Sequence, residues 1–349
     1  MNKKIVHLEL GKTGLYIPQI IFGTSALGNL YKVISEETKL EIIRECFKYV
    51  PKPVVFDCAG KYGAGLALEE LGRCLNTLKI KENDVIISNK LGWKRINLST
   101  SQPTFEPGVW HGLKFDAQQK ISYSGIIECW EQGNSLLGQK YSPQMLSVHD
   151  PDEYLDQAKS NSEKKKLFND ILDAYKALHD LKKQGKAQAI GIGAKNWEII
   201  REISEHVQLD WVMFANSLTI MKHPSQLISF IEKLSKKGIG IINSAVFNGG
   251  FLIGSNYFDY KPIDPINDSD KLIWRDNFYK ICEKHHVIPS VACVNFGMSP
   301  SYVTAISLNT SKPEHVKENV LSVTQEVPKQ FYEDMIKQKL ISPDYPFLK

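Results

Sequence analysis

The segment Val54-Val55-Phe56-Asp57-Cys58-Ala59-Gly60-Lys61-Tyr62-Gly63 decides the fold that we expect. It begins as an apolar run rich in β-branched residues, ends in a carboxylate and then breaks at glycines. This pattern is typical of a buried strand followed by a loop. The amphipathic stretch 66–78 comes directly after it and has the spacing of a helix. A strand followed by a helix is the repeating unit of folds with a parallel sheet.

The same alternation continues along the chain. Eight strands that alternate with helices can close a barrel, so we expect the α/β class and a (β/α)8 TIM barrel. The eight strand candidates are 20–23, 54–57, 85–88, 145–149, 189–193, 211–215, 239–243 and 303–306. The helical patterns are 36–49, 66–78, 124–137, 167–184, 197–206, 226–237 and 314–323.

The residues between these runs add detail to the predicted barrel. Gly185 and Gly238 each follow lysines that end a helical pattern, which predicts left-handed backbone at both glycines. The runs 6–10 and 15–17 flank a Gly-Lys-Thr-Gly turn and predict an N-terminal β-hairpin that could plug the N-terminal end of the barrel. The segment 92–122 contains prolines, glycines and tryptophans, and we expect an irregular loop at the C-terminal rim.

Composition excludes several classes of protein. The 42% hydrophobic and 23% charged residues are ordinary for a globular chain, and we treat 1–349 as one barrel domain. The net charge of +4 is spread along the chain, which does not favour nucleic-acid binding. The sequence has no apolar run long enough to predict a membrane span. Met1-Asn2-Lys3-Lys4 is not followed by the apolar region of a signal peptide, so we expect none. Six cysteines without a CxxC pair indicate reduced thiols and a cytoplasmic protein.

Four polar residues stand at or just beyond the ends of three successive strand candidates. Asp57 and Tyr62 follow the second strand, Lys90 the third and His149 the fourth. Because barrel enzymes hold substrate at the C-terminal ends of their strands, we expect all four side chains in one pocket.

The expected chemistry depends on Tyr62. A free phenol has a pKa near 10, and a neighbouring ammonium lowers that pKa. Lys90 can supply this charge, Asp57 can hold Lys90, and His149 can orient the reacting oxygen. Such a site would polarise a carbonyl or deprotonate an alcohol beside a hydride carrier.

Each residue taken singly also has a structural interpretation. A tyrosine after a strand is usually a packing residue, and Lys90 could be a solvated strand end. His149 could be a core or capping histidine, and Asp57 could cap the next helix. Their joint placement on successive strands favours the catalytic interpretation. His285-His286 are adjacent on a helical pattern and point in different directions, so we expect no metal site.

These residues carry a resemblance to a known family. The segment 56–63, followed by Leu68-Glu69-Glu70-Leu71-Gly72, resembles the aldo-keto reductase signature, and Lys90 and His149-Asp150 resemble its lysine and histidine. The resemblance implies a catalytic tetrad of Asp57, Tyr62, Lys90 and His149. It also implies NAD(P) bound without a Rossmann glycine motif, and no GxGxxG occurs in this chain.

The resemblance further implies a set of cofactor contacts. The segment 312–319 resembles the family's cofactor segment, in which Glu318 and Asn319 would contact the adenine. His315 and Asn309 stand where relatives often have the Arg and Lys that bind the 2′-phosphate of NADP. Because these cations are absent here, we expect NAD to be favoured over NADP. The other expected contacts are Gly23, Thr24, Asp57, Gly193, Lys195, Asn196, Ser244, Phe247 and Lys312.

Finer features resemble the sugar 1-dehydrogenase branch, including 105–110, 121–126, 148–152 and 244–250. They imply that an aldose such as L-fucose is oxidised at C1 to the lactone, with Trp93, Trp110 and His111 joining Tyr62 and His149 at the substrate. The alternatives are an NADPH-dependent aldehyde or ketone reductase and a non-catalytic nucleotide-binding barrel subunit. We expect a monomer or small homo-oligomer that acts on a small sugar or carbonyl compound.

Overall fold

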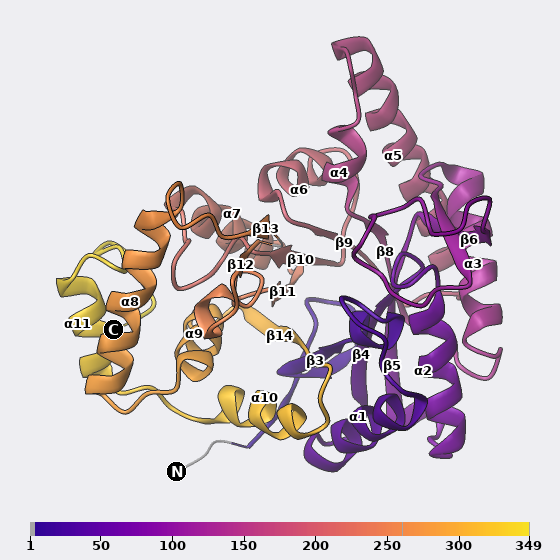
Figure 1. Cartoon of the computed structure of the whole chain (residues 1–349). Helices are drawn as coiled ribbons and strands as arrows, with labels where there is room; N and C mark the ends of the chain where they lie inside the picture. Colours follow the sequence, from indigo (N-terminus) through magenta and orange to yellow (C-terminus); the bar gives the residue numbers. More distant parts are fainter. Residues whose placement is uncertain (1–3, 260, 349) are drawn as a thin grey trace.

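Eight parallel strands close into a barrel, as the sequence predicts (Figure 1). The computed structural model describes residues 4–259 and 261–348, so Met1, Asn2 and Lys3, which entered the signal-peptide argument, lie outside it. The barrel order is β3 (Ile20–Gly23), β4 (Val54–Ala59), β5 (Val85–Leu91), β8 (Met145–His149), β9 (Ala189–Ala194), β10 (Trp211–Ala215), β11 (Gly240–Ser244) and β14 (Val303–Asn309).

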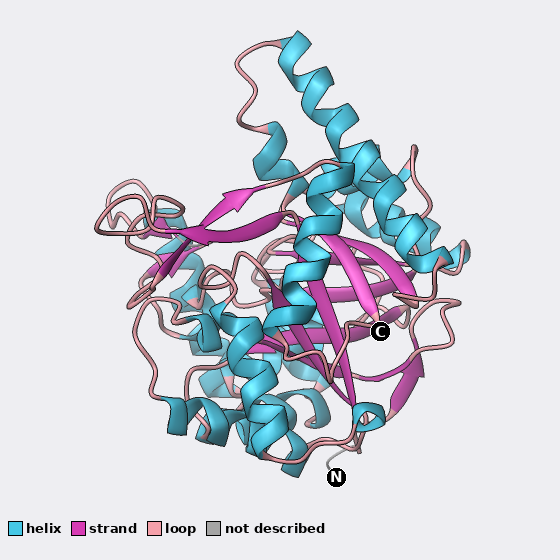
Figure 2. Ribbon diagram, turned by 90° about the vertical axis from the view of Figure 1, so that its right-hand side faces the viewer, coloured by secondary structure: helices cyan, strands magenta, loops and turns pink. Residues whose placement is uncertain are grey.

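A helix follows each barrel strand and packs on the outside (Figure 2). Most predicted helix bounds agree to within two residues. One prediction is wrong at its start: α5 begins at Asn161 and not at 167, because the Ser160 side chain accepts from the Glu163 backbone N–H and caps an earlier turn. The helices are α1 (Glu36–Tyr49), α2 (Leu66–Thr77), α3 (Tyr123–Leu136), α5 (Asn161–Lys183), α6 (Trp197–Ser204), α7 (Ser225–Lys236), α9 (Pro289–Gly297) and α10 (Glu314–Thr324).

The predicted helix ends and the N-terminal hairpin are confirmed. Gly185 and Gly238 have φ of 73° and 80°, the left-handed backbone expected after a lysine-rich last turn. Strands β1 (His7–Glu9) and β2 (Tyr16–Pro18) pair antiparallel. Three side chains of this hairpin join one buried cluster with inward-facing strand residues and so close the N-terminal end of the barrel: Leu10, Leu15 and Ile17.

The prediction that 92–122 is irregular is wrong in part. Strands β6 (Trp93–Asn97) and β7 (Phe115–Gln119) form an antiparallel pair, and the loop between them covers 98–114. These strands are mostly polar and only half-buried, so they lack the apolar alternation that identifies a strand in sequence. The Arg95 guanidinium lies over the Phe115 ring at 4.5 Å, which adds a cross-strand contact to the ladder.

Several short or atypical elements were not predicted. Helix α9 is apolar on nearly all faces and therefore shows no amphipathic period. Helices α8 (Ser269–Lys284) and α11 (Lys329–Lys337) lie outside the strand-helix alternation and pair with each other, where Asp334 accepts from His285 at 2.8 Å. The remaining elements are α4 (Pro151–Leu155), β12 (Tyr257–Phe258), β13 (Lys261–Pro262), η1 (Ser25–Gly28), η2 (Glu82–Asp84) and η3 (Phe251–Ile253).

Two further observations bear on the class of protein. All six cysteines are buried and free. Within residues 4–259 and 261–348, no helix combines the length and the apolar character needed to cross a bilayer.

Candidate active site

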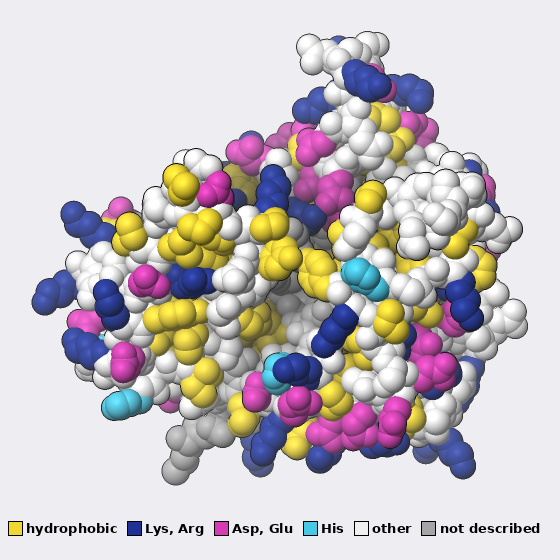
Figure 3. Space-filling model, viewed as in Figure 1, with side chains coloured by type: hydrophobic (Ala, Val, Ile, Leu, Met, Phe, Trp, Pro, Cys, Tyr) yellow, Lys and Arg dark blue, Asp and Glu magenta, His cyan; other side chains and the backbone are white. Residues whose placement is uncertain are grey.

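A cavity of about 470 Å³ opens at the C-terminal ends of the barrel strands, a size that suits a small-molecule site. Figure 3 shows a hollow near the centre of the same view as Figure 1. The sequence-predicted site residues that line this cavity are Gly23, Asp57, Tyr62, Lys90, Trp110, His149, Gly193, Lys195, Ser244, Phe247 and Asn309.

Lys90 connects the carboxylate and the phenol. Its Nζ donates to Asp57 Oδ2 at 2.5 Å and to Tyr62 Oη at 3.1 Å. Neighbouring strands produce this arrangement, because β4 and β5 pair in parallel and place Ala59 opposite Lys90. Ser88 Oγ donates to Asp57 Oδ1 at 3.2 Å and so fixes the other carboxylate oxygen. The chain therefore builds a buried ion pair whose cation faces one tyrosine hydroxyl.

The electrostatics of this pair differ from the expectation in one respect. Burial raises the pKa of the Tyr62 phenol; Lys90 lowers it, but not enough to offset burial and Asp57. Burial lowers the pKa of Lys90, and Asp57 and Tyr62 more than compensate and raise it. Lys90 lowers the pKa of Tyr62, as expected, but burial outweighs it, so the phenol is neutral at neutral pH and lies beside a charged ammonium.

His149 ends β8 and lies against Tyr62, with ring centroids 5.4 Å apart in an edge-on contact. Burial, followed by the positive charges of Lys90 and Lys61, holds the pKa of His149 well below its ordinary value. The ring is therefore neutral, and its buried Nδ1 has no hydrogen-bond partner. His149 lines the cavity, and a neutral imidazole there can share a hydrogen bond with a substrate oxygen.

Two glycines position the loop that carries Tyr62. Gly63 has a φ of 62°, and a Cβ built there would lie 2.3 Å from the Gly28 carbonyl oxygen in η1. We therefore expect Gly63→Ala to destabilise the fold by about 1–3 kcal/mol, from backbone strain alone, and to move Tyr62 away from Lys90. Thermal unfolding and kcat measured together test this expectation, and an unchanged kcat would contradict it. Gly185→Ala is the control, because that glycine also has positive φ but lies far from the cavity with open space around it.

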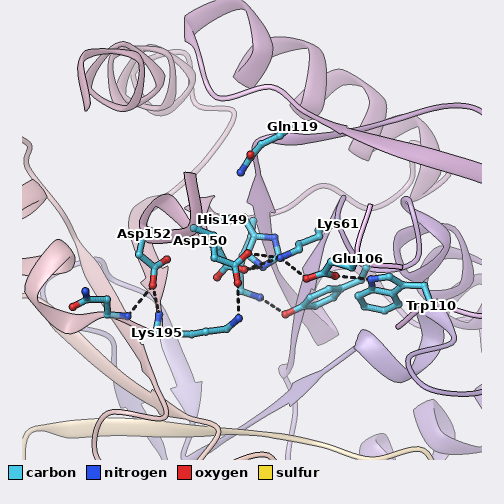
Figure 4. Close-up of polar contacts among 12 residues, drawn as sticks. Lys61, Glu106, Trp110, Gln119, His149, Asp150, Asp152 and Lys195 are labelled. Atoms are coloured by element: carbon cyan, nitrogen blue, oxygen red, sulfur yellow. Dashed lines mark hydrogen bonds and ion pairs between the residues drawn. The ribbon is translucent and has the colours of Figure 1, made fainter. Parts of the chain in front are cut away.

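A second charged cluster lies beside the tetrad and was not predicted (Figure 4). The Lys61 Nζ is within 2.9 Å of Glu106, 3.1 Å of Asp150 and 2.7 Å of Glu153. Glu153 also pairs with Lys195 at 2.5 Å. Burial lowers the pKa of Lys61, but the three carboxylates outweigh burial and raise it. Lys61 stands next to Tyr62 in the signature segment and Asp150 next to His149, which was the available sequence signal.

Eight predicted contacts lie outside the lining of the cavity, and four of these precede the C-terminal segment. Thr24 is buried and its Oγ1 donates to the Asp57 carbonyl oxygen at 3.0 Å. Asn196 caps α6 by accepting from the Glu198 backbone N–H. His111 is exposed, and Trp93 packs against Phe105 with ring centroids 6.0 Å apart. These residues support the site from behind or border it.

Of the predicted C-terminal cofactor contacts, Asn309 lines the cavity, whereas Lys312, His315, Glu318 and Asn319 do not. Asn309 Nδ2 donates to Ser25 Oγ at 2.7 Å, and both residues line the cavity. Lys312 precedes α10, and His315 and Glu318 on α10 approach to 3.9 Å. Asn319 Nδ2 is buried without a hydrogen-bond partner. Within the described residues, no group of three or more His, Cys, Asp or Glu side chains could hold a metal ion.

Comparison with known proteins extends these observations. The chain is 26% identical to pyridoxal 4-dehydrogenase of Microbacterium luteolum, over 95% of this chain and 97% of that protein. It is 23% identical to D-threo-aldose 1-dehydrogenase of Pseudomonas sp, over 94% and 96% of the two chains. It is 22% identical to L-galactose dehydrogenase of Arabidopsis thaliana, over 92% and 89%. The last two relatives agree with the sugar-dehydrogenase branch.

The fold matches solved structures as well. An aldo-keto reductase from Bacillus halodurans, solved in its holo form, superposes with a TM-score of 0.68 at 17% identity and covers 97% of each chain. The model of the aldo/keto reductase family matches residues 19–339. Its members generally use a nicotinamide cofactor. The chain therefore belongs to the aldo/keto reductase family and is an oxidoreductase.

Proposed function

We propose that this protein oxidises an aldose such as L-fucose at C1 to the lactone, with a nicotinamide cofactor as hydride acceptor and Tyr62 as the proton-transferring residue. The single observation that carries the proposal is the 3.1 Å contact between Lys90 Nζ and Tyr62 Oη inside a cavity that His149 also lines. Similarity to two sugar dehydrogenases supports the aldose as substrate.

The chain's own residues account for the proton. His149, which is neutral and lines the cavity, orients the C1 hydroxyl toward Tyr62. Tyr62 in its phenolate form accepts the hydroxyl proton, and the ammonium of Lys90 stabilises the phenolate charge. A nicotinamide cofactor held beside C1 would supply the acceptor for the hydride that leaves this carbon. Asp57 keeps Lys90 charged and in place throughout.

The proposed nicotinamide side of the cavity is lined by residues with small or no side chains: Gly23, Gly193, Ala194 and Ser244. Contact of Glu318 and Asn319 with the adenine is proposed from the resemblance of 312–319 to the family's cofactor segment. NAD is favoured over NADP, because His315 and Asn309 stand where a fixed cation would read a 2′-phosphate. The other proposed contacts on this side are Gly23, Lys195, Ser244, Phe247 and Lys312.

The reverse reaction is the second candidate, and the Tyr62 pKa favours it. A phenol whose pKa is raised is protonated at neutral pH and is ready to donate to a carbonyl oxygen. The same site would then reduce an aldehyde or ketone with NADPH. We further propose one barrel domain in a monomer or small homo-oligomer in the cytoplasm, where buried thiols such as Cys58 and Cys293 stay reduced.

A panel of substrates tests the proposed function. We expect purified protein to form reduced nicotinamide with at least one of L-fucose, L-galactose and D-arabinose, and the product to be the lactone. Pyridoxal belongs in the panel because of the relative that is named for it. Comparing the rates with NAD and NADP, in both directions of the reaction, shows which cofactor the enzyme prefers. Nucleotide binding without oxidation of any aldose, combined with reduction of simple aldehydes, would favour the second candidate.

The raised pKa of Tyr62 also predicts the dependence of each direction on pH. Oxidation needs the phenolate, so its kcat/KM should increase with pH. The midpoint of this increase should lie above the ordinary phenol pKa of about 10. Reduction needs the phenol, so its kcat/KM should fall over the same range. Initial rates between neutral and alkaline pH check both slopes. Oxidation that slows as pH rises would contradict the assignment.

A further inference from the structure

No residue of the cluster around Lys61 donates or accepts the proton in the transfer described above, yet the cluster shapes the same cavity. Glu106 comes from the loop between β6 and β7, whereas Lys61 follows β4. Glu106 Oε1 lies 2.9 Å from Lys61 Nζ, and Glu106 Oε2 accepts from Trp110 Nε1 at 2.6 Å (Figure 4). One carboxylate therefore fixes both an indole and a buried ammonium at the cavity wall.

These contacts leave acceptor capacity directed at a ligand. An ionised carboxylate has about four acceptor sites, and Glu106 uses two of them in the contacts above. Asp150 lines the cavity too and contacts Lys61 through Oδ2. His149 lines the same cavity, and its Nε2 lies 3.5 Å from Asp150 Oδ2, so a third polar side chain stands beside the two carboxylates. The Tyr62 and Trp110 rings, 5.9 Å apart, provide an apolar surface beside these acceptors.

The charges of the cavity also limit what can bind. Three lysines line it, and each is ion-paired: Lys61 with Glu106 and Asp150, Lys90 with Asp57, and Lys195 with Glu153. A phosphate or carboxylate on a substrate would meet ammonium groups that are already compensated, with further carboxylates close by. A neutral compound with several hydroxyl groups would instead donate hydrogen bonds to those carboxylates.

We propose that Glu106 and Asp150 determine specificity by accepting hydrogen bonds from hydroxyl groups of a neutral polyhydroxylated substrate, and that Lys61 and Trp110 are positioning residues that hold Glu106 for this role. The inference rests on the proposed active site and extends it to the part of the substrate remote from the reacting carbon. It assigns a function to an ion cluster that the chemistry at C1 does not require.

The test compares two aldehydes of equal carbon number in the direction of reduction, so that it does not depend on aldose oxidation. Glyceraldehyde carries two hydroxyl groups and propanal carries none. We expect the wild-type enzyme to prefer glyceraldehyde in kcat/KM. Glu106→Gln should lose at least about tenfold on glyceraldehyde, mainly through KM, as expected when a hydrogen bond to a charged group is lost. The loss on propanal should be several times smaller.

The glutamine variant keeps an acceptor for Trp110, so the loop should stay in place, and unchanged thermal unfolding checks this. Glu69→Gln is the matched control. Glu69 on α2 forms an ion pair at 2.8 Å with Arg95 on β6, the strand that leads into the loop of Glu106, but Glu69 lies outside the cavity. It should leave the preference for glyceraldehyde unchanged. Glyceraldehyde 3-phosphate should be a poorer substrate of the wild type than glyceraldehyde, again by at least about tenfold.

The outcomes separate the two proposals. Equal losses on glyceraldehyde and propanal in Glu106→Gln, or a wild type that shows no preference between them, would overturn the specificity role. Equal use of the phosphate ester would overturn it as well. If the wild type oxidises no aldose but Glu106→Gln shows the predicted loss on glyceraldehyde, this inference is retained and aldose oxidation is rejected.

Discussion

Tyr62→Phe should lower kcat by at least about a hundredfold in both directions, because a positioned general acid or base contributes roughly 10²–10⁴ in rate. Phenylalanine keeps the ring and its contacts with Trp110 and His149. It removes only the hydroxyl that Lys90 contacts at 3.1 Å. We therefore expect the fold and the binding of nucleotide to persist while turnover is lost. Steady-state rates and the shift in thermal unfolding on adding nucleotide measure the two effects separately.

The matched control is Tyr175→Phe. Tyr175 is also buried, and its hydroxyl donates to the Gly191 carbonyl oxygen at 3.1 Å, outside the cavity. Its loss should cost stability, by about 0.5–1.5 kcal/mol, with kcat nearly unchanged. If Tyr62→Phe retained wild-type turnover, the protein's activity would not depend on this phenol. A wild type that binds nucleotide without turnover in either direction would favour the non-catalytic subunit.

Lys90→Met should have the second largest effect, because it removes the cation that serves both Tyr62 and Asp57. Without Lys90 the phenolate loses its stabilising charge, and we expect kcat to fall by about 10² or more. The Asp57 carboxylate would also be left buried without its partner. Breaking such a pair costs about 3–5 kcal/mol of folding stability.

A double variant separates these two consequences. Asp57→Asn combined with Lys90→Met removes both charges, and replacing a whole buried pair is often close to neutral for stability. We expect the double variant to unfold near the wild-type temperature and to remain inactive. Recovery of activity together with stability would mean that Lys90 acts only through the fold. Urea unfolding and kcat on the three proteins decide the question.

Much of the barrel was predictable because its strands are buried on both sides and read as continuous apolar runs. The turn glycines Gly185 and Gly238 were predictable for a related reason, since left-handed backbone after a helix is a local requirement. The gathering of Asp57, Tyr62, Lys90 and His149 followed from the same pattern, because strand ends of a parallel barrel meet at one rim.

Features that depend on tertiary contacts were not predictable. The β6–β7 pair is held by a backbone ladder and by Arg95 over Phe115, neither of which leaves an alternating apolar pattern. The contact between Glu106 and Lys61 joins residues far apart in the chain. The sign of the Tyr62 pKa shift depends on how far burial outweighs Lys90, and the amount of burial is a property of the folded cavity.

The most direct test of the central claim, that the Lys90 ammonium acts on the Tyr62 phenol, is the pH dependence of kcat/KM for aldose oxidation in the wild type and in Lys90→Met. Lys90 lowers the pKa of Tyr62 against the effect of burial, so its removal should move the alkaline inflection of the residual activity to higher pH. An inflection at the same pH in both proteins would show that the ionisation governing the reaction belongs to a group that Lys90 does not influence.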